Sequence, residues 1–171
     1  IAVLAALAAI LIYIWFRFEW PFAASAVVAL THDVITTIGL FAITGLEFNL
    51  STVAALLTIA GYSINDTVVV FDRVRDNLRK YKSWSIPDIL SLSLNETLSR
   101  TIMTSLTTLI ALVSIFLFGG AVLADFALAM IWGVLIGTYS SIFVAVSALL
   151  FFDLTPIDDD EDTPTPEYEQ A

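Results

Sequence analysis

The sequence contains no cysteine, one histidine and few charged residues. Without cysteine the chain cannot form disulfides or thiolate metal sites. The single histidine stands outside any cluster of metal-ligating residues, and the chain has no glycine-rich phosphate loop, so we expect no enzyme, no resident cofactor and no metal site. Charged residues make up 14% of the 171 positions, against about 25% in a typical soluble domain. Together with a mean hydropathy of +0.90, this scarcity predicts a membrane protein.

Five long apolar segments account for most of the chain. They cover about residues 1–16, 22–44, 50–71, 97–118 and 122–152. Because a helix crosses the hydrocarbon core with about 20 apolar residues, and because strict apolar–polar alternation is missing, each segment predicts a helix rather than a barrel strand. We therefore expect an all-α fold, a polytopic membrane bundle of five transmembrane helices within residues 1–154. A basic connection at 72–96 separates the third and fourth spans.

The charged residues are distributed unevenly. The formal net charge is −10, and seven of the 17 acidic residues lie in the segment 155–171, which predicts a disordered, solvated tail. Six of the seven Lys and Arg lie between Arg73 and Arg100, and the seventh is Arg17. Because basic loops favour the cytoplasmic side, we expect the basic connection and the tail in the cytoplasm and Ile1 on the outer face. Carboxylates within the same connection argue against a nucleic-acid partner.

Ionisable side chains also occur inside the predicted spans. They are Asp33, with His32 beside it, Asp66 and Arg100. A charge at the centre of a spanning helix costs about 2.5–3.5 kcal/mol on insertion scales, so such residues are expected to face the bundle interior or water. By the helical rise, Asp66 lies about 10 Å from the basic end of its span, and Asp33 lies close to the middle of its own.

Hydroxyl side chains surround Arg100 at helical spacing. They are Thr97, Thr101, Thr104, Thr107 and Thr108. On the third span, Ser63 shares a face with Asp66, and Asn65 precedes it. Such groups can hydrogen-bond a carboxylate, a guanidinium or a file of water. The alternative for each hydroxyl is a bond to the carbonyl four residues earlier in its own helix. The number of hydroxyls around one arginine favours a polar site.

Asp66 and Arg100 allow two interpretations. In the first, they form a permanent buried ion pair that fixes helix register, which is not necessarily a net gain in stability. In the second, the pair is conditional: movement of the guanidinium relative to the carboxylate changes the proton affinity of the carboxylate, so that Asp66 alternately captures and releases a proton. The second interpretation predicts a proton relay, which His32 could join.

Small residues recur every four positions on the fifth span, and they include Gly133, Gly137 and Ser141. Small residues at this spacing let a neighbouring helix approach closely. We expect this face to be a packing surface that permits sliding, rather than a ligand site.

Several long stretches of the chain form a recognisable set. They are GYSINDTVVVFDRVRDNLR (61–79), LNETLSRTIMTSLTTLIAL (94–112), FALAMIWGVLIGTYSSIFVA (126–145), HDV (32–34) and GLFAITGLEFNL (39–50). Together they closely resemble one family, the SecF protein-export membrane proteins. The resemblance covers nearly the whole chain except the first span and the acidic tail. It implies a six-span protein of the bacterial inner membrane, of which this chain represents spans two to six. The abrupt start on an apolar run, without an initiator methionine, agrees with that expectation.

The resemblance also implies partners and roles. The protein would pair with SecD in a unit of the resistance–nodulation–division type, and would use the proton motive force to help SecYEG and SecA move preproteins across the membrane. Asp66 of the GYSxNDT motif and Arg100 of the LSRT motif would be the functional membrane charges. Support from Asp33, His32, Asn65, Ser63, Thr104 and Thr107 rests on their polarity and placement. Two other functions stay open: a proton-coupled exporter of small molecules, and a structural subunit in which the ion pair is static.

Overall fold

The computed structural model describes residues 2–45, 49–152 and 154, and this part of the chain is helical with no strand. The elements are α1 (Ala2–Arg17), α2 (Trp20–Thr44), α3 (Leu50–Lys80), α4 (Ile86–Phe118), α5 (Ala121–Tyr139), a π-helix (Ser140–Ala145) and α6 (Val146–Leu149). The last three form one helix of 29 residues, called span five below. The expected all-α bundle of five helices is confirmed, while the predicted tail 155–171 lies outside the described residues.

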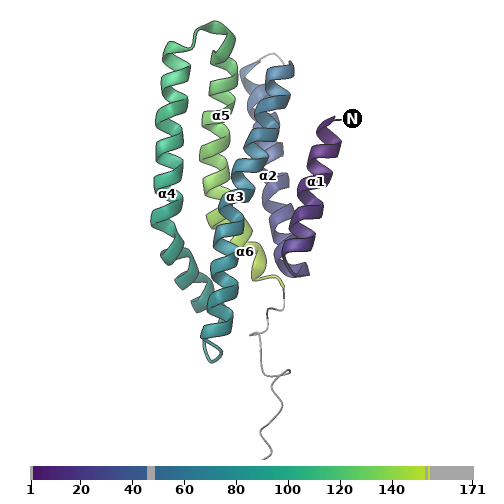
Figure 1. The fold of residues 1–171 in the computed structure, drawn as a ribbon, viewed down its shortest axis with the longest axis vertical. Coiled ribbons are helices and arrows are strands. Elements are labelled where there is room, and N and C mark those ends of the chain that lie inside the picture. The colour runs from purple at the N-terminus through teal and green to yellow at the C-terminus, as the bar shows by residue number, and fades with distance from the viewer. Residues whose placement is uncertain (1, 46–48, 153, 155–171) are drawn as a thin grey trace, which may run out of the picture.

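Four of these helices are long and apolar enough to cross a membrane: α2, α3, α4 and span five. The first, α1, has 16 residues, which is fewer than the roughly 20 that a span of the hydrocarbon core requires. Consecutive helices run in opposite directions, so Arg17, the turn at 81–85 and Leu149 lie at one end of the bundle, the lower end in Figure 1. The basic residues outside the predicted spans therefore share this end, called the basic end below.

The basic connection expected at 72–96 is mostly helical. α3 continues to Lys80 and α4 begins at Ile86, so only a short turn separates the two helices. Outside the hydrocarbon core of the membrane, charged residues are compatible with a helix. One buried side chain, that of Asn77, links these two helices. The amide nitrogen of Asn77 donates hydrogen bonds to Ser93 Oγ at 2.9 Å and to Glu96 Oε2 at 2.8 Å. At the opposite end, Gly120 adopts φ of 74°, a value that favours glycine, and so permits the tight turn into α5.

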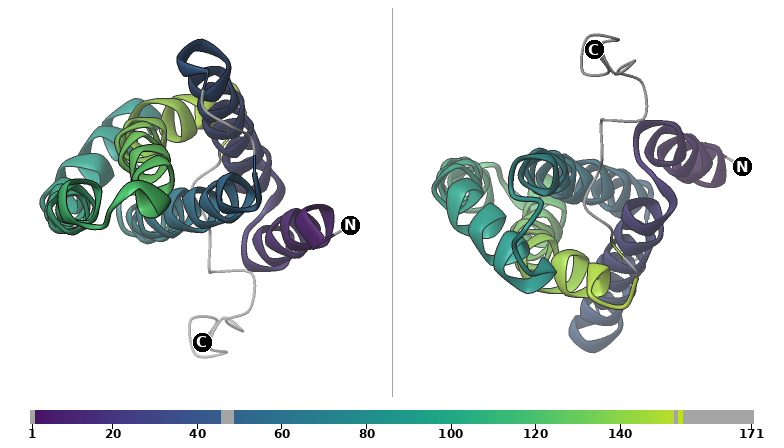
Figure 2. Two further views of the ribbon diagram at one scale, coloured as in Figure 1. Left: turned by 90° about the horizontal axis from the view of Figure 1, so that it is seen from above. Right: turned by 90° about the horizontal axis from the view of Figure 1, so that it is seen from below.

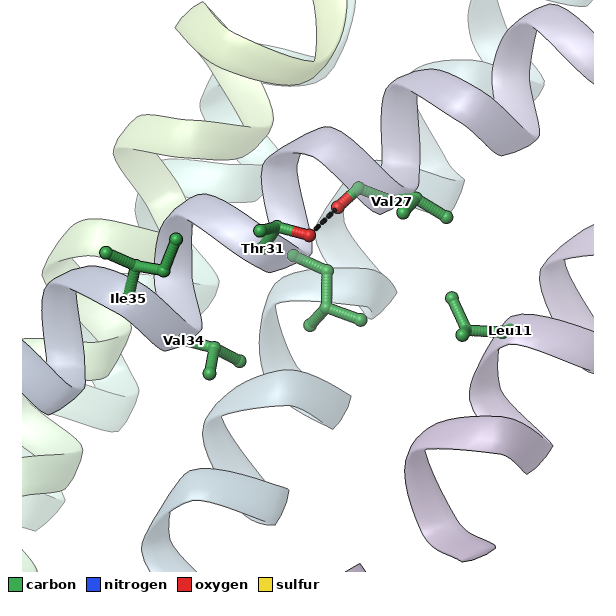
Figure 3. A pocket seen from close by; sticks show the side chains of 6 residues that line it. Leu11, Val27, Thr31, Val34 and Ile35 are labelled. Carbon is green, nitrogen blue, oxygen red and sulfur yellow. Dashed lines mark hydrogen bonds between the residues drawn. The ribbon is translucent and has the colours of Figure 1, made fainter. Parts of the chain in front are cut away.

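The helices pack around α3, which contacts every other long helix (Figures 1 and 2). α1 lies at the edge of the bundle and packs mainly against α2 and α3. Between α1 and α2 is an apolar pocket of about 210 Å³, in which Leu11 faces Val27 and Val34 (Figure 3). The described part of the bundle therefore consists of a tight group of four helices with α1 beside it.

Two apolar clusters form the core, and polar residues lie between them. The cluster nearer the basic end includes Phe22, Phe71 and Leu149, and the other includes Ile59 and Val134. On α2, no buried residue of either cluster lies between Leu30 and Phe41. On span five, none lies between Val134 and Ala145. The buried polar residues in these gaps are Asp33, Thr37, Ser140 and Ser141. Asp33 bonds to Ser63 of α3, and Ser141 bonds to Thr67 and to the carbonyl of Ser63.

Candidate functional site

Asp66 lies in the middle of α3 and is buried, with 4% of its surface exposed. Its Oδ2 atom has no hydrogen-bond partner among the described residues. The neighbouring Asn65 points away from this interior and is exposed. An ionisable oxygen without a partner inside a helix bundle is unfavourable, so Asp66 is a candidate functional residue.

Arg100 lies on α4 and is exposed in the described chain. No ion pair within 4.0 Å joins it to Asp66. In this conformation the two residues therefore do not form the static pair of the structural interpretation. Arg100 instead lines a pocket of about 270 Å³ between α3 and α4, together with Val69, Asp72, Arg73, Asp76, Glu96 and Thr97.

The hydroxyl groups around Arg100 bond mainly to their own helix. Thr104 donates to the carbonyl of Thr101, and Thr107 donates to the carbonyls of Met103 and Thr104. Thr107 is exposed, and neither hydroxyl reaches Asp66. Thr101 differs, because its buried Oγ1 has no partner among the described residues. The stripe is present as spacing predicts, and its members range from the buried Thr97 and Thr101 to the exposed Thr107.

Ion pairs gather at the basic end. Arg17 binds both carboxylate oxygens of Asp72, at 2.7 and 2.8 Å. Arg73 Nε lies 2.7 Å from Glu96 Oε2. Because Arg73 and then Asn77 donate hydrogen bonds to Glu96, the pKa of this carboxyl, in the polar segment between two spans, lies below its ordinary value. Asp72, Arg73 and Glu96 of these pairs also line the Arg100 pocket.

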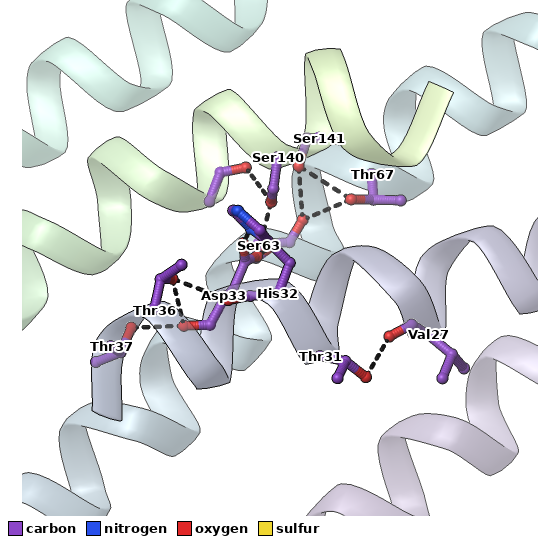
Figure 4. Close-up of polar contacts among 11 residues, drawn as sticks. Val27, Thr31, His32, Asp33, Thr36, Thr37, Ser63, Thr67, Ser140 and Ser141 are labelled. Carbon is purple, nitrogen blue, oxygen red and sulfur yellow. Dashed lines mark hydrogen bonds and ion pairs between the residues drawn. The ribbon is translucent and has the colours of Figure 1, made fainter. Parts of the chain in front are cut away.

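Asp33 has a richer environment than Asp66. Its side chain is completely buried on α2, and its Oδ2 accepts hydrogen bonds from Ser63 of α3 and, at 2.8 Å, from Ser140 of the π-helix. His32 Nδ1 lies 3.1 Å from Asp33 Oδ1, and its ring lies near Tyr139. Figure 4 shows these side chains converging from three elements. Asp33, His32 and Ser63, which sequence reasoning proposed separately, therefore belong to one network.

Sequence reasoning missed Ser140 and treated Ser141 only as a packing residue. Ser141 Oγ lies 2.9 Å from Thr67 Oγ1 and donates to the carbonyl of Ser63 at 3.2 Å. The signal for both was the pair of consecutive serines in an apolar segment. The spacing of small residues concealed it, since Ser141 fitted the four-residue repeat.

The repeated small residues bring span five close to α3. A Cβ on Gly133 would lie 2.2 Å from Cγ1 of Ile59, and one on Gly137 would lie 3.1 Å from Cβ of Ser63. The two backbones therefore approach more closely at these positions than any larger residue would permit. This approach places Ser140 and Ser141 within reach of α2 and α3.

Fold and site together define a class: a multi-pass α-helical membrane protein with two carboxylates buried between its helices. Within the described ranges, no group of three or more His, Cys, Asp and Glu is placed to hold a metal ion. Residues 1–154 match the family described as "Protein export membrane protein SecD/SecF, C-terminal". The chain belongs to this family.

Individual relatives agree with that assignment. The chain is 61% identical over 153 residues to the protein translocase subunit SecF of Rhodobacter capsulatus, covering 90% of this chain and 46% of the relative. It is 54% identical over 151 residues to SecF of Rickettsia bellii, covering 88% of this chain and 50% of the relative. The chain thus spans about half the length of the curated relatives it matches.

Solved structures show the same fold. The crystal structure of SecDF from Thermus thermophilus, a translocon-associated membrane protein, matches with a TM-score of 0.84 and 47% identity, over 88% of this chain and 21% of that one. A crystal structure of SecDF in a super-membrane-facing form matches with a TM-score of 0.80 and 47% identity, over 85% of this chain and 20% of that one. The arrangement of helices is therefore that of one part of a larger membrane protein.

Proposed function

We propose that this chain is the membrane portion of a SecF-type subunit that uses proton flow, together with SecD, to assist preprotein translocation through SecYEG and SecA. It resides in the bacterial inner membrane, with the basic end and the acidic tail in the cytoplasm and the Ile1 end on the periplasmic side. Protons are its only coupling ions, and it uses no cofactor. In this proposal the chain neither binds nucleic acid nor acts as an enzyme. Its family and the SecDF neighbours support this proposal.

The observation that carries the proposal is the buried Asp66 carboxylate with its unpartnered Oδ2. Asp66 lies one helical turn from Val69, which lines the Arg100 pocket. A carboxylate with an unpartnered oxygen gains or loses a proton without breaking a hydrogen bond at that oxygen. Acidic side chains in the pocket, Asp72, Asp76 and Glu96, make it polar enough to hold water. Protons leaving Asp66 would reach the basic end through this pocket.

Arg100 sets the proton affinity of Asp66 in this mechanism. In the present conformation the guanidinium lies in the pocket and makes no ion pair with the carboxylate. Rotation of α4 or a new side-chain rotamer would bring the positive charge to Asp66 and favour its ionised form. Because Thr104 and Thr107 already donate to backbone carbonyls, they would contribute only as acceptors for a transient file of water.

The test uses the full-length protein reconstituted with SecD and SecYEG in vesicles. In Asp66→Asn the proton-gradient-dependent part of preprotein export should be lost, while the part driven by SecA and ATP remains. Arg100→Gln should have the same effect, and Arg100→Lys should retain part of the activity because it keeps the charge. Asp125→Asn is the matched control, because this half-buried carboxylate lies on α5 near the opposite end of the bundle.

The proposal is wrong if Asp66→Asn retains full proton-dependent export while it assembles normally with SecD. A static structural role would instead appear as loss of the folded, assembled complex in either single variant. Co-purification with SecD and SecYEG supports export, whereas a complex lacking both would favour the exporter of small molecules.

A further inference from the structure

Span five is interrupted by a π-helical turn over Ser140–Ala145, next to the buried Asp33. A π turn inserts a residue into the helix and weakens its backbone hydrogen bonding, so it persists where surrounding contacts stabilise it, and such turns are frequent at functional sites. The side-chain hydrogen bonds of this turn come from its first two residues, while Ala145 packs into the apolar core. Ser140 bonds to α2, and Ser141 bonds to α3.

We call these contacts the serine clamp, and its members are Asp33, Ser63, Thr67, Ser140 and Ser141. All five are buried, with at most 2% of their surface exposed. Asp33 accepts from Ser63 and Ser140, while Ser141 joins Thr67 and the carbonyl of Ser63. The clamp therefore joins three helices through hydroxyl groups, two of which donate to the Asp33 carboxylate (Figure 4).

The clamp has a second arrangement available. Ser140 carries one hydroxyl proton but has two acceptors, Asp33 Oδ2 at 2.8 Å and the carbonyl oxygen of Gly137 at 3.2 Å. A hydrogen bond to a charged acceptor is stronger than one to a neutral acceptor. While Asp33 is charged, the hydroxyl is therefore held across to α2. When that charge is lost, the carbonyl within span five competes for the same proton, and the link between the helices weakens.

The clamp also brackets Asp66 on α3. Ser63 lies three residues before Asp66, on the same helical face, and Thr67 follows it directly. His32 on α2 is the titratable side chain in contact with Asp33, and Tyr139 at the end of α5 lies near the His32 ring. Asp66 lies about one turn along α3 from Ser63, which donates to Asp33. A movement of the π turn would therefore shift the segment of α3 that carries Asp66.

We propose that Asp33 is a positioning residue: its carboxylate holds the π-helical turn of span five against α3, and loss of its charge releases this turn beside Asp66. The inference rests on the proposed function of Asp66, to which it adds the device that links protonation to helix movement. A hydrogen bond to a charged group changes an equilibrium constant by a factor of about ten to a hundred. Removal of the Ser140 hydroxyl should therefore lower the ratio of clamped to released molecules by about that factor.

The first measurement is a distance between two spin labels in the full-length protein assembled with SecD. Labels at Ile35→Cys on α2 and Phe143→Cys in the π turn occupy exposed positions on either side of the clamp. This chain contains no cysteine that would also be labelled, and cysteines elsewhere in the complex are replaced. Asp33→Asn and Ser140→Ala should each shift or broaden the distance distribution. Ser25→Ala should not, because this buried hydroxyl has no partner in the described part of the chain.

The second measurement is the pH profile of proton-driven export. Both clamp variants should shift the pH of half-maximal activity, since they change the surroundings of Asp66. A residue that merely stabilised the fold would lower the rate equally at every pH. If Asp33→Asn fails to assemble, Ser140→Ala decides the question, because it removes a single oxygen.

The outcomes separate the two proposals. If Asp66→Asn retains proton-driven export, the proposed function is overturned, and with it the link from the clamp to Asp66. If Asp66→Asn abolishes that activity while Ser140→Ala changes neither the distance distribution nor the pH profile, only the clamp is overturned. A change in both readings with Ser140→Ala, and in neither with Ser25→Ala, supports it.

Discussion

The close approach of span five to α3 at Gly133 permits a quantitative prediction for Gly133→Ala. An added Cβ would lie 2.2 Å from Cγ1, 2.4 Å from Cδ1 and 2.8 Å from Cγ2 of Ile59. Carbon atoms in optimal contact are about 3.5–4.0 Å apart, so the two helices would have to separate by roughly 1 Å or more. Ile59 is 1% exposed and cannot move aside into open space.

Two opposing effects determine the magnitude. Overpacking a buried position costs about 1–3 kcal/mol, and the depth of this clash points to the upper half of that range. Alanine is favoured over glycine inside a helix by about 1 kcal/mol. The net expectation is a loss of about 1–2 kcal/mol in the free energy of unfolding. Gly61→Ala on α3 is the matched control, because its Cβ meets nothing within 4 Å, and it should be neutral or stabilising.

The assay is unfolding of the full-length protein in detergent, followed by tryptophan fluorescence. A second variant, Ile59→Ala, removes all three clashing atoms, so its combination with Gly133→Ala should be less harmful than the sum of the two single changes. The reasoning is refuted if Gly133→Ala is as stable as Gly61→Ala, or if the double variant shows simple additivity.

Three further predictions concern a helix cap and two ion pairs, and they are checked by the same unfolding assay. Asn49→Ala should destabilise by about 1 kcal/mol, because the Asn49 side chain caps α3 by accepting from two backbone amides. Arg17→Gln should change stability by no more than about 1 kcal/mol, with a difference that shrinks in high salt, since its pair with Asp72 is partly exposed. The lowered pKa of Glu96 means that its ionised form stabilises the fold at neutral pH. That contribution disappears as the pH falls through the lowered pKa, so wild type and Glu96→Gln should converge in acid. A larger effect of Arg17→Gln, an unchanged stability of Asn49→Ala, or a Glu96→Gln difference that grows in acid would contradict these arguments.

Local sequence predicted the helices well, because hydropathy is a property of neighbouring residues. It predicted less well where helices end outside the membrane: the polar segment 72–96 continues two helices that the apolar pattern stops at Phe71 and resumes at Thr97. A charged segment is compatible both with a loop and with a solvated helix. The tertiary structure shows helices here, and Asn77 of α3 joins them by its hydrogen bonds to Ser93 and Glu96 of α4.

By itself, the sequence determined that the chain is a bundle of membrane helices and that Asp66 and Arg100 are ionisable groups within them, since the cost of burying a charge depends on residue type and depth. Tertiary structure alone decided which groups meet. Asp33 and Ser140 are 107 residues apart, and they form a hydrogen bond because Ser140 lies in the π turn. Arg100 lines a polar pocket and forms no ion pair with Asp66. Such pairings depend on helix crossing and register, which no local pattern encodes.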